Sequence, residues 1–138
     1  MTQRTVGDPS PLLQSLGDGR VVEFIAGENR AVMEFTARSE FCHSGDVVQG
    51  GFVTAWIDSA MAHAAMLATE GALAPATLEI KVSFFRSANP GPVRAEGWVQ
   101  RLGRSIAFLE GRVTTLGGDV LAMATSTVKL VPTDRRRD

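Results

Sequence analysis

Residues 47–69 decide the fold, and they read VVQGGFVTAWIDSAMAHAAMLAT. From Phe52 to about Glu70 the segment is rich in alanine and methionine and has no strand breaker, which predicts one long helix that ends at Gly71. Asp58 is the only formally charged side chain in residues 47–69. A helix on one face of an open sheet needs a polar stripe toward water, and this helix lacks one. We therefore expect a second subunit to cover the side that one sheet leaves open, so that the protein is an obligate oligomer, a dimer or a dimer of dimers.

Shorter elements surround this helix. Apolar and polar residues alternate from Leu78 to Phe84, which is typical of a half-buried antiparallel strand. The predicted elements are a short helix over 10–17, a hairpin of strands over 21–25 and 30–36, a polar loop over 38–51, and strands over 78–84, 93–100, 105–115 and about 120–131. This order predicts an α+β domain, an antiparallel sheet of five to six strands with one long helix on its apolar face.

Length and composition set the broad class. The chain has 138 residues and a mass of 14.7 kDa, which fits a single domain over 1–138, with an N-terminal extension over about 1–19 and a frayed tail over 132–138. The basic tail could alternatively bind phosphate. Fourteen basic and fifteen acidic residues give a net charge of −1, which argues against nucleic acid as a partner.

The sequence also bears on the compartment. Cys42 is the single cysteine and cannot form an internal disulfide, so a reducing cytoplasm is the expected location. The first nine residues lack the apolar core of a signal peptide. Asp58 interrupts the one apolar run that approaches the length of a bilayer span, so we expect no membrane partner.

Asp58 and the helix start are the main candidates for chemistry. A carboxylate inside a buried helix is costly unless it is partnered, so Asp58 is either a structural group bonded to Thr54 or to a facing subunit, or a catalytic carboxylate in an interface cleft. Gln49-Gly50-Gly51 opens the helix, where free backbone N–H groups could polarise a carbonyl or where a plain turn could lie. Asp58 follows Gly50 by eight residues, about 12 Å along one helix, so a shared substrate would need the helix of an antiparallel neighbour.

The segment over residues 41–60, FCHSGDVVQGGFVTAWIDSA, resembles the hotdog-fold acyl-CoA thioesterases of the phenylacetate-degradation (PaaI-like) group, within the 4-hydroxybenzoyl-CoA thioesterase superfamily. Their signature is His-Gly-Gly at the start of the central helix and an acidic residue eight positions after its first glycine. Residues 82–88 and 102–107 are similar to the sheet of the same family, so the resemblance covers about residues 20–131. It implies a hotdog fold, with the sheet wrapped around the helix and continued through a dimer.

The resemblance also implies roles for residues. Asp58 would be the catalytic carboxylate, Gly50 the N–H donor to the thioester carbonyl, and His43 would take the place of a polar loop residue that is often an amide. Gln49 stands where the family usually has histidine, and it cannot titrate. The residues that we expect to bind substrate are Gln49, Gly51, Thr77, Arg86, Arg104 and Ser105.

The expected function is hydrolysis of an acyl-CoA thioester to a carboxylic acid and free coenzyme A. Asp58 would act as nucleophile or as general base, and coenzyme A would arrive as part of the substrate, with no metal and no other cofactor. Arg86, Arg101 and Arg104 could bind its phosphates or could be solvated strand-end charges, and Arg104 is the preferred candidate.

Other interpretations stay open at this point. His63 is expected to be a core or interface histidine, and Cys42 beside His43 is a weak candidate for a nucleophile pair. A 3-hydroxyacyl dehydratase of the same fold would pair His43 with Asp58, although the chain lacks the His-Phe-Pro-Gly loop typical of such enzymes. A non-catalytic acyl-CoA-binding module is the third alternative.

Overall fold

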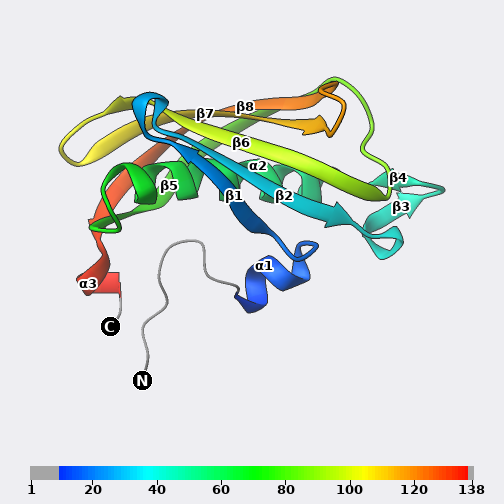
Figure 1. The fold of residues 1–138 in the computed structure, drawn as a ribbon, viewed down its shortest axis with the longest axis horizontal. Helices are drawn as coiled ribbons and strands as arrows, with labels where there is room; N and C mark the ends of the chain where they lie inside the picture. The colour runs from blue at the N-terminus through cyan, green and yellow to red at the C-terminus, as the bar shows by residue number, and fades with distance from the viewer. Residues whose placement is uncertain (1–9, 137–138) are drawn as a thin grey trace.

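A computed structural model describes residues 10–136 and shows one antiparallel sheet arched over a long helix (Figure 1). Its six strands are ordered β1-β2-β6-β7-β8-β5, and the long helix is α2 (Gly50–Ala68). The strands are β1 (Arg20–Ile25), β2 (Arg30–Ala37), β5 (Leu73–Phe84), β6 (Gly91–Leu102), β7 (Ile106–Thr115) and β8 (Val120–Pro132). The smaller elements are α1 (Pro11–Ser15), η1 (Ala26–Glu28), η2 (Ser39–Phe41), the hairpin β3 (Cys42–Ser44) and β4 (Val47–Val48), and α3 (Thr133–Arg136). The α+β class with a six-stranded sheet is confirmed.

Several boundaries differ from the prediction. The long helix begins at Gly50 rather than Phe52, because the two glycines form its first turn instead of ending a loop. The predicted loop over 38–51 contains the β3–β4 hairpin. Strand β5 begins at Leu73 rather than Leu78, since Pro75 is paired with Leu130 on one side only, and an edge strand tolerates proline.

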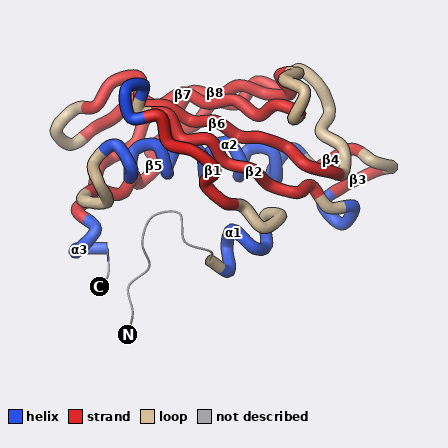
Figure 2. The backbone as a smooth tube through the Cα atoms, viewed as in Figure 1, coloured by secondary structure: helices blue, strands red, loops and turns tan. Residues whose placement is uncertain are grey.

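The core lies between α2 and the concave face of the sheet, and Figure 2 shows the strands as one curved layer along the helix. Trp56, Ile57 and Met61 of α2 are fully buried against it. No residue from Phe52 to Thr69 is exposed, although the side of α2 that faces away from the sheet is only half-buried. The curl of the sheet therefore covers more of the helix than the open sheet assumed from the sequence.

Both ends of the described chain are tied to the domain. Leu13 of α1 is buried, and the Trp56 indole Nε1 donates a hydrogen bond to the Leu16 carbonyl at 2.7 Å. Residues 10–19 thus pack onto the domain, and residues 1–9 lie outside the described part. In the tail, Thr133 N donates to the Ala72 carbonyl at 3.0 Å. The last two residues, 137 and 138, also lie outside it.

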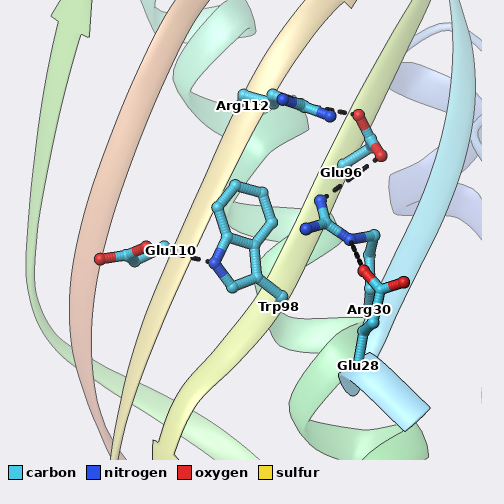
Figure 3. Close-up of polar contacts among 6 residues, drawn as sticks. All are labelled: Glu28, Arg30, Glu96, Trp98, Glu110 and Arg112. Carbon is cyan, nitrogen blue, oxygen red and sulfur yellow. Dashed lines mark hydrogen bonds and ion pairs between the residues drawn. The ribbon is translucent and has the colours of Figure 1, made fainter. Parts of the chain in front are cut away.

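The convex face of the sheet carries a network of paired charges around one indole (Figure 3). The Arg30 guanidinium lies 4.2 Å from the Trp98 ring centroid, and the indole Nε1 donates to Glu110 at 3.2 Å. Glu96 accepts from Arg112 at 2.8 Å and lies 3.5 Å from Arg30. Stacking and charge pairing together hold these side chains against the outer face of the sheet.

Gly97 of β6 lies directly against the backbone of α2, and it provides a test of this packing. A Cβ at Gly97 would lie 2.4 Å from the Met61 backbone N and 2.5 Å from the Ala60 carbonyl. We expect Gly97→Ala to lower the free energy of unfolding by about 1–3 kcal/mol or more, because the overlap is with backbone. The matched control is Gly27→Ala, whose added Cβ meets nothing within 4 Å. Urea titration measures the free energy of unfolding of both variants. Equal stability of the two would contradict the close packing of β6 against α2 at Gly97.

Candidate active site

The first half of the candidate site is the N-terminus of α2. The Gln49 N donates to the Phe41 carbonyl at 2.9 Å, and the Val48 N donates to the Ala88 carbonyl at 3.0 Å, so the chain entering the helix is fixed from two sides. Among the described residues the amides of Gly50 and Gly51 donate no hydrogen bond. Free donors at the positive end of a helix dipole suit a carbonyl oxygen on which negative charge develops.

An aromatic ring lies directly against this helix start. A Cβ at Gly50 would lie 3.3 Å from Cζ of Phe84, the last residue of β5. A larger residue at position 50 would therefore require the exposed Phe84 ring to shift by a few tenths of an ångström. The sequence analysis did not single out Phe84, although its place at the end of the alternating run puts it on the helix-facing side of the strand.

The second half of the site is Asp58, in the middle of α2. The Thr77 hydroxyl donates to Asp58 Oδ1 at 3.4 Å, and no basic side chain of the described residues forms an ion pair with this carboxylate. Thr54 is not its partner, because the Thr54 hydroxyl donates to the Gly50 carbonyl. Burial raises the pKa of Asp58, and the hydrogen bond from Thr77 opposes that rise in part.

The two halves lie apart within one chain. Eight helical residues separate Gly50 from Asp58, which corresponds to about 12 Å. Their contacts on β5 show the same offset, since Phe84 lies at Gly50 and Thr77 lies at Asp58, seven residues earlier. One copy of the chain therefore presents a free helix N-terminus and a half-buried carboxylate as two separate features along the same strand.

The remaining predicted residues lie around these two features. His43 is exposed in β3 and its Nδ1 is 2.9 Å from the Ser44 hydroxyl, so His43 is not hydrogen-bonded to Asp58. Gln49 is exposed and makes no side-chain cap to α2. Arg86 follows β5 at the Gly50 end and forms an exposed 3.5 Å ion pair with Asp119.

Arg104 and Ser105 are exposed in the β6–β7 turn, at the other end of the sheet. This location follows from the pairing of the strands: the Ser105 carbonyl accepts from Leu130, and Leu130 is opposite Pro75 near the start of β5. The two candidate phosphate-binding arginines, Arg86 and Arg104, thus lie toward opposite ends of β5.

The other titratable candidates are held by structural contacts. His63 is buried, its Nδ1 is 2.8 Å from the Ser59 carbonyl, and burial lowers its pKa, so it is neutral at pH 7. Its location fits the expected core histidine. The Cys42 thiol points to the Arg38 carbonyl at 3.9 Å and makes no hydrogen bond to His43.

Residues 10–136 contain neither a metal cluster nor a membrane-spanning helix. No three His, Cys, Asp or Glu side chains in this range come together in a way that could hold a metal ion. No helix in the same range is long and apolar enough to cross a membrane.

The sequence model of the thioesterase superfamily matches residues 45–122 of this chain. This range contains α2, β5, β6, β7 and the start of β8. The chain belongs to the thioesterase superfamily. A protein of Saccharolobus solfataricus named as an esterase is 32% identical over 93 residues, which are 67% of this chain and 64% of that protein. The match thus spans less than two thirds of that relative's length.

Solved structures show the same architecture. Phenylacetic acid degradation protein PaaI of Thermus thermophilus, solved as a point mutant, is 27% identical, with a TM-score of 0.74 over 87% of this chain and 98% of that one. A phenylacetic acid degradation-related protein of Ralstonia eutropha shares the fold at 24% identity, with a TM-score of 0.80 over 88% and 92% of the two chains. The PaaI-like resemblance and the hotdog fold are confirmed.

The raised pKa of Asp58 predicts how stability depends on pH. The folded protein holds the Asp58 proton more tightly than the unfolded chain, so stability from this group is greatest below its ordinary pKa and falls as pH rises through the raised value. At neutral pH the buried, ionised carboxylate lowers the stability of the folded protein, and Asp58→Asn removes this charge. We therefore expect the melting temperature of the variant to exceed that of the wild type at about pH 7. The difference should close toward about pH 4, where Asp58 is protonated in both states.

Melting scans across this pH range check the prediction, with Asp134→Asn as the control because Asp134 is exposed in α3. If Asp58 instead anchored a structural charge pair, Asp58→Asn would lose about 3–5 kcal/mol at neutral pH. That loss would contradict the account.

Proposed function

We propose that this protein hydrolyses an acyl-CoA thioester in a site shared by two copies of the chain, with Asp58 of one copy and the Gly50 amide of the other. The observation that carries the proposal is a half-buried carboxylate without an ion-pair partner in an otherwise uncharged helix, beside an exposed edge strand. Membership of the thioesterase superfamily and the esterase name of a relative support thioester hydrolysis.

The need for a second copy comes from the free edge of β5. Within the described residues this strand pairs only with β8 and exposes two large apolar side chains, Leu78 at 58% and Phe84 at 53%, and Phe85, the residue after the strand, is 57% exposed. A long exposed edge with apolar side chains is a template for pairing with another strand. Antiparallel pairing of two β5 strands would extend the sheet across a dimer and would place the two helices in opposite directions.

The chemistry follows from this placement. The Gly50 amide polarises the thioester carbonyl and stabilises the oxyanion that forms when the carbonyl carbon is attacked. Asp58 either attacks that carbon directly or removes a proton from an attacking water. Both routes need the ionised carboxylate, so the raised pKa of Asp58 places the loss of activity toward acid above the usual range of an aspartate.

Coenzyme A would extend from this site over charged residues at the sheet ends. Arg104 is exposed and forms no ion pair among the described residues, whereas Arg86 is paired with Asp119. We therefore assign the phosphate contact to Arg104 first. Gln49, Gly51, Thr77 and Ser105 would line the path of the thioester and its pantetheine arm, and His43 remains a candidate at the helix start.

Activity of the Asp58→Asn variant tests the proposal. Thiol release would be measured on aryl, short-chain and long-chain acyl-CoA thioesters, because the related phenylacetate proteins make an aryl group one of several candidates. We expect kcat to fall by at least about 100-fold on whichever thioester the wild type cleaves, the usual scale for loss of a general base. Asp134→Asn should keep the wild-type rate.

Two results would contradict the proposal. Retained thiol release in Asp58→Asn would remove this carboxylate from the mechanism. Absence of thiol release by the wild type, combined with hydration of an enoyl thioester, would support the dehydratase of the same fold instead.

A further inference from the structure

The pattern of charges along β5 defines how two copies pair, and this inference rests on the proposed shared site. Glu79 and Lys81 are exposed on the convex face of the sheet, on either side of Ile80, whose side chain packs toward the core. Their neighbours on β8 are Thr127 and Thr125. The charges at 79 and 81 thus lie two residues apart on one face of an edge strand.

These two charges contrast with the paired charges at the centre of the convex face. Arg94 of β6 and Arg112 of β7 are paired with acids of the same face, Arg94 with Glu34 and Arg112 with Glu96 (Figure 3 shows the second pair). Among the described residues Glu79 and Lys81 form no ion pair, and the one contact of the Glu79 carboxylate is the hydroxyl of Thr127 at 2.9 Å. Their opposite charges are therefore available to a partner at the free edge.

Symmetry restricts the possible registers. Directly opposite residues of an antiparallel pair point to the same face, so two copies with both helices on one side of the joined sheet must have a two-fold axis through a residue. An axis through Glu79 sets two glutamates side by side, and an axis through Lys81 does the same with two lysines. Like charges directly opposite are destabilising, whereas opposite charges stabilise.

We propose that a second copy of this chain pairs with β5 about a two-fold axis at Ile80, so that Glu79 lies opposite the partner's Lys81 and Lys81 lies opposite the partner's Glu79. The two Ile80 side chains then meet on the core side of the joined sheet. Each dimer contains two such ion pairs above one apolar contact.

This register also brings the two halves of the candidate site together. Glu79, Ile80 and Lys81 pair with residues whose numbers sum to 160, and the bulge between Thr77 and Glu79 shifts the pairing before it by one residue. Thr77 is therefore opposite the partner's Val82, and the partner's Phe84 lies two residues farther along the same face. Thr77 contacts Asp58, and Phe84 contacts Gly50 within its own chain. Asp58 of one copy therefore lies near the partner's Gly50, as the proposed function requires.

Charge reversal tests the register without any activity assay. We expect Glu79→Lys and Lys81→Glu each to weaken self-association by about 10-fold or more, since each homodimer then contains two like-charge pairs. Mixed together, these two variants form a heterodimer in which both pairs are again opposite, so native mass spectrometry should find it well above the statistical one half. High salt should reduce the preference. Lys129→Glu, exposed on the same face in β8, is the control and should associate like the wild type.

Cysteine crosslinking is a second test that does not depend on charge. In a Cys42→Ser background, Ile80→Cys places two thiols directly opposite, within disulfide range. Val82→Cys is the control, because its two copies would lie four residues apart, about 13 Å. We expect a crosslinked dimer for the first and none for the second.

The outcomes separate the register from the proposed function. A statistical mixture of charge variants, or crosslinking at 82 and not at 80, overturns the register, even if thiol release by the wild type shows that the function is right. A wild-type chain that sediments as a monomer overturns both the register and the shared site. Heterodimer formation by a protein without thiol release supports the register and contradicts the function.

Discussion

The desolvation of one carboxylate is the constraint on which the rest of this account depends. Asp58 interrupts a helix that is otherwise uncharged, and burial raises its pKa while a single threonine hydroxyl lowers it in part. An ionised carboxylate in this position lowers the stability of the fold unless a charged or hydrogen-bonding partner compensates its loss of solvent. The neighbouring strand β5 is an edge of the sheet, so a partner bound at that edge would lie close to this carboxylate.

The sequence predicted the helix and its charge pattern well, because both depend on local composition. It predicted the strands less well at their ends: the apolar–polar alternation placed the start of this strand at Leu78, whereas β5 begins at Leu73 and includes Pro75, which an edge strand tolerates. The helix start was placed two residues late, since two consecutive glycines favour a turn in the absence of tertiary contacts. The pairing of strands across the sheet supplied the context that a local pattern lacks.

The candidate site was predictable in its residue types but not in its arrangement. Asp58 and Gly50 stand out from spacing and from a family resemblance, and their separation along one helix already indicated a second subunit. The contact of Phe84 with Gly50 depends on where β5 runs relative to α2, which no spacing rule gives. That contact and the Thr77–Asp58 hydrogen bond are what relate the two site halves to positions on one strand.

The central claim is that each site combines Asp58 of one copy with Gly50 of the other, and complementation between chains tests it most directly. Gly50→Pro removes the amide donor while proline is tolerated at the first helical position, and Gln49 with ψ 133° already has a conformation suited to precede it. Two tagged chains, one with Asp58→Asn and one with Gly50→Pro, would be co-expressed and the mixed dimer purified. The account predicts about half of the wild-type thiol release, because one of the two sites then contains both native groups, and none when both changes are in one chain paired with a wild-type chain. An inactive first dimer together with a half-active second dimer would show that each site lies within one chain, and would contradict the account.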